Sequence, residues 1–175
     1  MPITISGSTG IAGVDGSAAT PAVQGTDTNT GEFFPAADTI AWTTGGSERM
    51  RVDSSGNLLF NSGYGSVATA YGCRAWVNFN GTGTVAIRAS GNVTSITDNG
   101  TGDYTVNFTN AMPDANYSYE VSAGNPTDVP RICLNATGGT QTESAPTTSS
   151  CRFFINNAAN SAQLDCKYIN VAVFR

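Results

Sequence analysis

No helix of about three turns fits anywhere in this sequence, because Gly, Pro or β-branched residues interrupt every candidate window and no apolar period of about 3.6 residues persists. Gly, Thr, Ser and Asn together fill 75 of the 175 positions. These residues favour strands or tight turns over helices. We therefore expect an all-β chain of short strands joined by many turns.

The chain contains no histidine, which excludes Ser-His-Asp and Cys-His catalysis, the HExxH metalloprotease helix and imidazole zinc sites. With one lysine, seven arginines and a net charge of -5, it lacks the basic stripe that a phosphate backbone demands. We expect no catalytic residues, no metal site, no cofactor and no nucleic-acid partner.

No apolar run approaches the roughly 20 residues of a membrane span, and the first residues lack the basic start and hydrophobic stretch of a secretory signal. We therefore expect no membrane insertion and synthesis in a cytoplasm. Use outside a cell would then require lysis, an unrecognised export route or assembly into a larger particle. A virion fits this constraint well.

The second part of the chain, residues 63–175, alternates apolar and polar residues in eight short runs separated by turn residues. In one run Tyr104, Val106 and Phe108 fall on one face, as in a half-buried strand. The Asn-Gly pair before it favours positive φ and predicts an antiparallel hairpin with the preceding run. The expected strands are 74–80, 84–89, 93–97, 104–109, 117–122, 131–135, 151–156 and 164–174. Together they predict an antiparallel β-sandwich-like domain.

The first part, residues 1–62, has sparse apolar residues that come in isolated pairs, and a turn cluster at its end. Such a segment buries too little surface by itself to offset an ordering entropy of roughly 1–2 kcal/mol per residue. Three identical chains wound about one axis would supply a shared core, so we predict an extended, intertwined segment in a homotrimer. A disordered arm is the alternative. The aromatic residues Phe33, Phe34 and Trp42 favour the ordered form.

Three stretches of the chain resemble segments of bacteriophage tail-fibre and related virion proteins. Residues 34–58, which read TTGGSERMRVDSSGN at 43–57, are similar to a segment widespread in that family. Residues 71–84, YGCRAWVNFNGTGT, and 96–108, ITDNGTGDYTVNF, are similar to a β-rich domain that recurs in phage structural proteins. The similar segments keep their order and spacing between residues 34 and 108.

The resemblance implies a virion structural protein, usually a homotrimer and often a fibre or its tip, and it implies no catalytic site. Typical tail fibres are much longer than this chain, which favours a short tail fibre, a fibre tip or a decoration subunit. We expect a contribution to host-surface recognition, with the first part contacting other virion proteins. A head-decoration or baseplate-linking protein with only virion partners is the alternative.

The segment Glu48, Arg49, Met50, Arg51 and Val52 alternates charged with apolar side chains. Met50 and Val52 can therefore face an inner seam while Glu48 meets an arginine of a neighbouring chain. Solvated surface charge is the alternative. The complete set of predicted interchain seam residues is Phe33, Phe34, Trp42, Glu48, Arg49, Met50, Arg51 and Val52.

The four cysteines have no CxxC spacing, which argues against a zinc site or a redox dithiol. Cys151 and Cys166 would lie nearly opposite each other if residues 156–160 turn a hairpin, so they are the disulfide candidates. Free buried thiols in a reducing cytoplasm are the alternative.

Aromatic side chains on loops can stack on sugar faces without any catalytic group. Tyr64, Tyr71, Tyr117 and Tyr119 are the candidates for binding a host cell-surface glycan, with core or interchain packing as the alternative for each. The acids Asp114, Glu120, Asp128 and Asp165 sit in no motif of a glycan hydrolase. Asp98, Asn99 and Asp103 faintly resemble a calcium turn, but a hairpin loop explains them better.

Overall fold

The computed structural model describes the whole chain except residues 1–3, 7–9, 64, 125–130, 135–144 and 159–161. The described residues form strands and turns and no helix, which confirms the all-β prediction. The chain divides into two compact units, Met1–Ala70 (unit 1) and Tyr71–Arg175 (unit 2). The unit boundary in the structure lies after residue 70, whereas we predicted it after residue 62, in the turn that precedes strand β8 (Ala68–Thr69).

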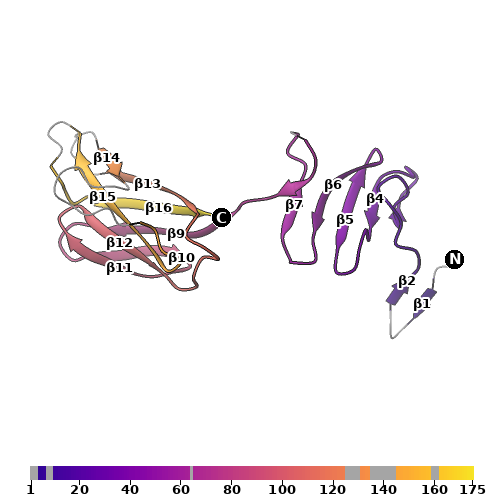
Figure 1. Cartoon of the computed structure of the whole chain (residues 1–175), viewed down its shortest axis with the longest axis horizontal. Helices are drawn as coiled ribbons and strands as arrows, with labels where there is room; N and C mark the ends of the chain where they lie inside the picture. Colours follow the sequence, from indigo (N-terminus) through magenta and orange to yellow (C-terminus); the bar gives the residue numbers. More distant parts are fainter. Residues whose placement is uncertain (1–3, 7–9, 64, 125–130, 135–144, 159–161) are drawn as a thin grey trace. The chain divides into compact units, whose positions relative to one another are not determined.

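Unit 2 consists of two four-stranded antiparallel sheets that face each other (Figure 1). One sheet has the order β10-β9-β16-β13 and the other has the order β11-β12-β15-β14. The strands are β9 (Cys73–Asn80), β10 (Ala86–Gly91), β11 (Val93–Gly100), β12 (Asp103–Phe108), β13 (Ser118–Gly124), β14 (Arg131–Leu134), β15 (Ser150–Asn157) and β16 (Tyr168–Phe174). Each overlaps a run that predicted it, and the predicted β11–β12 hairpin is confirmed. The last strand begins at Tyr168 rather than at residue 164.

The core of unit 2 lies between the two sheets, where every second side chain of the central strands points inward. Phe79 of β9 and Tyr104 of β12 meet edge to face with ring centroids 5.3 Å apart. Phe153 of β15 packs against both rings. All three residues are fully buried, so aromatic packing joins the two layers at their centre.

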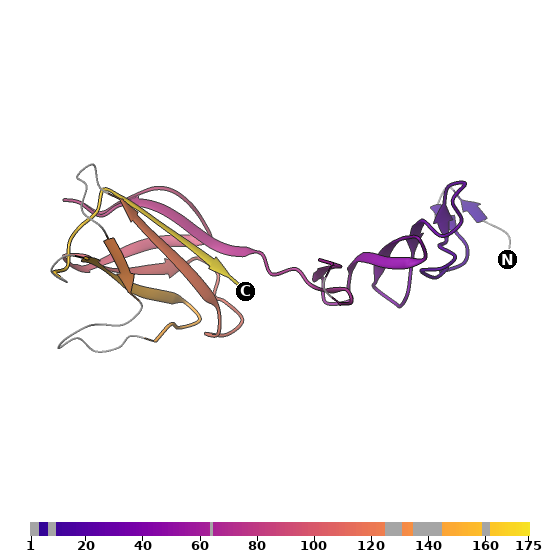
Figure 2. The same cartoon turned by 90° about the horizontal axis from the view of Figure 1, so that it is seen from above.

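Unit 1 contains one antiparallel sheet whose six strands follow one another in chain order, together with a separate two-stranded hairpin. Both views draw the larger sheet as a single layer (Figure 1, Figure 2). The sheet is formed by β3 (Val23–Gln24), β4 (Gly31–Phe33), β5 (Ile40–Thr44), β6 (Ser47–Val52), β7 (Leu58–Phe60) and β8, and the hairpin by β1 (Thr4–Ser6) and β2 (Gly10–Ala12). The structure thus differs from the predicted extended, intertwined segment, because these strands pair with one another within the chain.

Candidate functional site

The β5–β6 hairpin at the centre of unit 1 determines which side chains share a face of the sheet. Its turn is the Gly-Gly pair at residues 45–46, whose φ angles of 59° and 72° suit a type I′ turn. The pairing places Trp42 opposite Met50 and Ile40 opposite Val52. Because cross-strand partners point to the same side of a pleated sheet, these four apolar side chains lie on one face.

The same face continues onto the neighbouring strands. On β7, Phe60 pairs with Met50 and Leu58 pairs with Val52. On the other side Trp42 pairs with Glu32 of β4 and Glu32 pairs with Val23 of β3, so the Glu32 carboxylate lies between Trp42 and Val23 on this face. We call this surface the apolar sheet face. It consists of Val23, Ile40, Trp42, Met50, Val52, Leu58 and Phe60.

The apolar sheet face is open to solvent in the single chain. Leu58 and Phe60 are 46% and 44% exposed, and the four central side chains are partly exposed. A groove of about 450 Å³ runs beside Trp42 and is bounded by Val23 and Thr44. Contiguous apolar patches are uncommon on monomers and mark interaction surfaces. This face is therefore the candidate functional site of unit 1.

The opposite face of the sheet is covered by the chain itself. Phe33, Ala41 and Thr43 are buried there. The segment 13–22 crosses them, and the Thr43 hydroxyl lies 2.8 Å from the carbonyl oxygen of Ala18, within hydrogen-bonding distance. The sheet therefore has one face that its own chain covers and one that it leaves open.

Of the predicted seam residues, Trp42, Met50 and Val52 lie together on the apolar sheet face. Phe33 does not, because it is buried on the opposite face. Phe34 follows β4 and is partly exposed.

The charged seam residues make contacts within their own chain. Arg51 donates two hydrogen bonds to the Glu48 carboxylate, and this ion pair raises the pKa of Arg51. Arg49 is the extra residue of a β-bulge, and its Nε donates to Thr44 Oγ1 at 2.9 Å. The structure thus satisfies Glu48 and Arg51 without the neighbouring chain that we predicted for them.

Four members of the apolar sheet face were missed from the sequence: Val23, Ile40, Leu58 and Phe60. The signal that could have found them is their spacing, because Ile40 precedes Trp42 by two residues and Leu58 precedes Phe60 by two. That period places each pair on one side of a strand.

Two of the tyrosines proposed for glycan binding belong to the core, which contradicts that prediction. Tyr117 and Tyr119 are 7% and 8% exposed, and each hydroxyl bonds to backbone carbonyl oxygens of the opposite sheet region. Burial raises the pKa of Tyr117 and raises that of Tyr119 to about 12. Tyr71, at the start of unit 2, is exposed. Tyr64 lies outside the described residues.

All four cysteines are free thiols in the structure, so the predicted Cys151–Cys166 disulfide is not formed. Both residues are buried. After β15 the chain does turn back, and Asn156 bridges Gln163. Beyond that bridge β12 pairs with β15, and the carbonyl oxygen of Cys166 accepts the Gly81 N–H at 2.9 Å instead.

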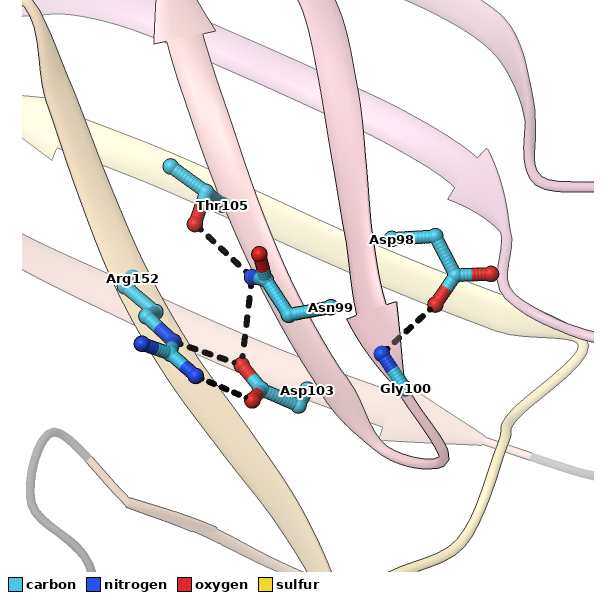
Figure 3. Close-up of polar contacts among 6 residues, drawn as sticks. All are labelled: Asp98, Asn99, Gly100, Asp103, Thr105 and Arg152. Atoms are coloured by element: carbon cyan, nitrogen blue, oxygen red, sulfur yellow. Dashed lines mark hydrogen bonds and ion pairs between the residues drawn. The ribbon is translucent and has the colours of Figure 1, made fainter. Parts of the chain in front are cut away.

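The loop that faintly resembled a calcium turn is the β11–β12 hairpin, and its polar groups bond to one another (Figure 3). Asp103 accepts two hydrogen bonds from Arg152 and one from Asn99. Asp98 accepts the Gly100 N–H at 3.0 Å. Among the described residues no group of three or more metal-ligating side chains occurs.

Asp114 and Asp165 each contact other residues of unit 2. Asp114 forms an ion pair with Arg175, which lowers the pKa of Asp114. Asp165 accepts the Gly102 N–H at 2.8 Å and lies 2.7 Å from the Tyr104 hydroxyl. Glu120 is exposed, and Asp128 lies outside the described residues.

No protein-family model, curated protein or solved structure matches this chain. Among the residues that the structure describes, no helix is long and apolar enough to cross a membrane.

Proposed function

We propose that this chain is a non-catalytic structural protein of a bacteriophage virion, a short trimeric tail fibre or fibre tip. Unit 1 associates with two further copies through the apolar sheet face and contacts other virion proteins. Unit 2 contributes to recognition of the host surface. The resemblance of residues 43–57, 71–84 and 96–108 to phage structural proteins supports the virion assignment.

The observation that carries the proposal is the one-sided sheet of unit 1. Among the described residues of unit 1, the buried apolar side chains are those of Pro21, Phe33 and Ala41. The seven apolar side chains of the apolar sheet face stay exposed or partly exposed. Burying apolar surface contributes about 25 cal/mol per Å², so association through this face supplies the core that the single chain lacks. Three such sheets around one axis enclose all three faces at once.

The virion assignment has a second form, a head-decoration or baseplate-linking protein. In that case another virion protein covers the apolar sheet face, and the isolated chain is a monomer.

The solution mass of the full chain, measured by light scattering with and without reductant, tests the proposal. We expect a stable mass of three times the 18.0 kDa of one chain under both conditions. A monomer would refute the free-standing trimer in favour of the linking protein. A mass of twice one chain would refute threefold symmetry. Loss of the oligomer on reduction alone would assign its stability to disulfides between chains, for which Cys73 is exposed, and would refute an apolar seam.

A further inference from the structure

The outer face of the β10-β9-β16-β13 sheet carries exposed aromatic rings at positions where a solvated sheet normally has polar residues. Trp76 of β9 is 45% exposed and Tyr168 of β16 is 46% exposed. Trp76 pairs with Ala172, and Asn78 pairs with Asn170, so Trp76 and Tyr168 lie four residues apart along neighbouring strands. At about 3.3 Å per residue their separation along the strands is about 13 Å.

The Trp76 side chain packs against the backbone of the neighbouring strand β10. A Cβ atom at Gly91 of the edge strand β10 would lie 2.5 Å from the Trp76 Nε1 atom, so the indole ring rests on the bare backbone of that glycine. Within the described part of the chain no hydrogen bond from Nε1 is formed. The ring is thus held in place while its N–H remains available to a ligand.

Between the two rings lies a row of polar side chains on three adjacent strands. Asn78 Nδ2 donates to Asn170 Oδ1 at 2.6 Å, and Asn170 Nδ2 lies 3.4 Å from Ser122 Oγ. These amides are exposed and keep donor and acceptor sites beyond those used within the row. A ligand that stacks on the two aromatic rings can therefore form hydrogen bonds with these amides between the rings.

Two cations converge on Tyr168. The Arg88 guanidinium carbon lies 4.8 Å from the centre of the ring and the Lys167 Nζ lies 5.7 Å from it. Arg88 also donates to the carbonyl oxygen of Lys167, which fixes its position. Among the residues that the structure describes, neither cation is in an ion pair. In a chain of net charge -5, this is a local site for an anion.

The outer face of the other sheet of unit 2 is different. Asn107 Nδ2 bonds to Ser95 and Thr97, and Arg152 is paired with Asp103. Its polar groups are thus bound to one another, and the cation there is neutralised.

We propose that Trp76, Asn78, Arg88, Lys167, Tyr168 and Asn170 form a binding face for an acidic oligosaccharide with carboxylate-bearing sugars. The apolar C–H faces of sugar rings stack on Trp76 and Tyr168. Sugar hydroxyls bond to the Asn78 and Asn170 amides, and a sugar carboxylate pairs with Arg88 and Lys167. The inference rests on the proposed function, since it names what unit 2 recognises.

The chain's two tryptophans make the test specific, because Trp42 lies in unit 1 and Trp76 in unit 2. The full chain, labelled with nitrogen-15, is titrated with trigalacturonate and, separately, with neutral galactotriose at equal ionic strength. We expect the Trp76 indole N–H signal to shift with trigalacturonate, far less with galactotriose, and the Trp42 signal to stay in place.

Two variants with the same charge change separate the binding face from net charge. Arg88→Gln is expected to weaken trigalacturonate binding about three- to fivefold, as for loss of an exposed charge pair. Arg49→Gln in unit 1 is expected to leave it unchanged. Trp76→Ala is expected to weaken binding at least about tenfold, with the fold checked by the other amide signals.

Three results would overturn the inference: no shift of Trp76, equal shifts with both sugars, or equal effects of Arg88→Gln and Arg49→Gln. A Trp76 signal that broadens with protein concentration in the absence of sugar would instead show that this face joins copies of the chain. The solution mass is a separate readout, so a trimer without sugar binding refutes only the binding face. Binding by a monomer refutes only the trimer.

Discussion

Unit 1 and unit 2 are both antiparallel β structures, yet they bury their apolar side chains in opposite ways. Unit 2 encloses its core between two sheets, where Phe79, Tyr104 and Phe153 meet. Unit 1 has one large sheet, and most of its large apolar side chains lie on the face that the other described residues of unit 1 leave exposed or partly exposed. The difference shows that alternating apolar and polar residues are enough to form a strand, whereas a buried core requires a second layer packed against the sheet.

This comparison predicts different dependences on association. Unit 2 buries enough apolar surface to fold within one chain, whereas unit 1 leaves Trp42, Leu58 and Phe60 accessible. The stability of unit 1 should therefore depend on protein concentration, and that of unit 2 should not.

The largest effect is expected from Trp42→Asp. Placing a carboxylate on the apolar sheet face requires its desolvation on association, which costs several kcal/mol. We expect complete loss of the trimer, measured by analytical ultracentrifugation, while unit 2 keeps its fold. Ser54→Asp, which adds the same charge in the exposed β6–β7 turn, is the control and should leave the mass unchanged. A trimer formed by the Trp42 variant would refute the seam.

Alkaline pH should unfold unit 2 selectively. Burial raises the pKa values of Tyr104 and Tyr117, and raises those of Tyr119 and Cys151 to about 12. In the unfolded chain the pKa of a cysteine thiol is about 8.5 and that of a tyrosine phenol is about 10. The unfolded state therefore loses protons first, so this stability is fully present below those values and falls as pH rises above them, by about 1.4 kcal/mol per group and pH unit.

The measurement for this prediction is tyrosinate absorbance together with circular dichroism between neutral pH and pH of about 12. Three of the six tyrosines, those at 104, 117 and 119, should ionise only as unit 2 unfolds. Titration of all six near pH 10, with the circular dichroism unchanged, would contradict the buried placement.

Phe79→Ala should destabilise unit 2 by about 3–5 kcal/mol, because it leaves a cavity against the Tyr104 and Phe153 rings. Urea unfolding measures this loss, and the trimer mass should not change. Phe174→Ala removes the same side chain from a partly exposed site on β16 and should have a much smaller effect. Equal effects of the two substitutions would place the core elsewhere.

The smallest effect is expected from Asp103→Asn. It keeps the shape of the side chain but removes the charged partner of Arg152 on the outer face of β12 and β15, at a cost of about 1–3 kcal/mol. Urea unfolding is again the measurement. Asp98→Asn, in the same hairpin but at a carboxylate that accepts the Gly100 N–H and forms no ion pair among the described residues, is the matched control. An equal loss of stability in both variants would show that the Asp103–Arg152 ion pair does not stabilise unit 2.

Most strands of unit 2 could be predicted because their alternation lasts for six to eight residues, as in the run of Tyr104, Val106 and Phe108; only β14 is shorter, at four residues. In unit 1, β4 and β7 are three residues long, which is too short for a period to appear. Their pairing is instead determined by the turns, such as the Gly-Gly pair at residues 45–46. The sequence therefore suggested an extended segment where the chain forms a sheet.

The candidate site was predictable only in part for a related reason. Met50 and Val52 are two residues apart on one strand, so they could be placed on one seam, but Phe33 could not be assigned to the other face without the register. Tyr117 and Tyr119 are two residues apart, and that spacing indicated burial as well as it indicated binding. Trp76 lies between the buried residues Ala75 and Val77 in β9. Because all three are apolar, the sequence of this strand does not indicate which of its faces points outward.

Hydrogen exchange of the full chain at a series of protein concentrations tests the central claim most directly. It follows the backbone amides of β5 and β6 in unit 1 beside those of β9, β12 and β16 in unit 2. We predict that protection of β5 and β6 falls as the chain is diluted below its association range, while protection in unit 2 stays constant. Protection of both units that is independent of concentration would contradict the account, because it would show that the single-layer sheet is stable without a second copy.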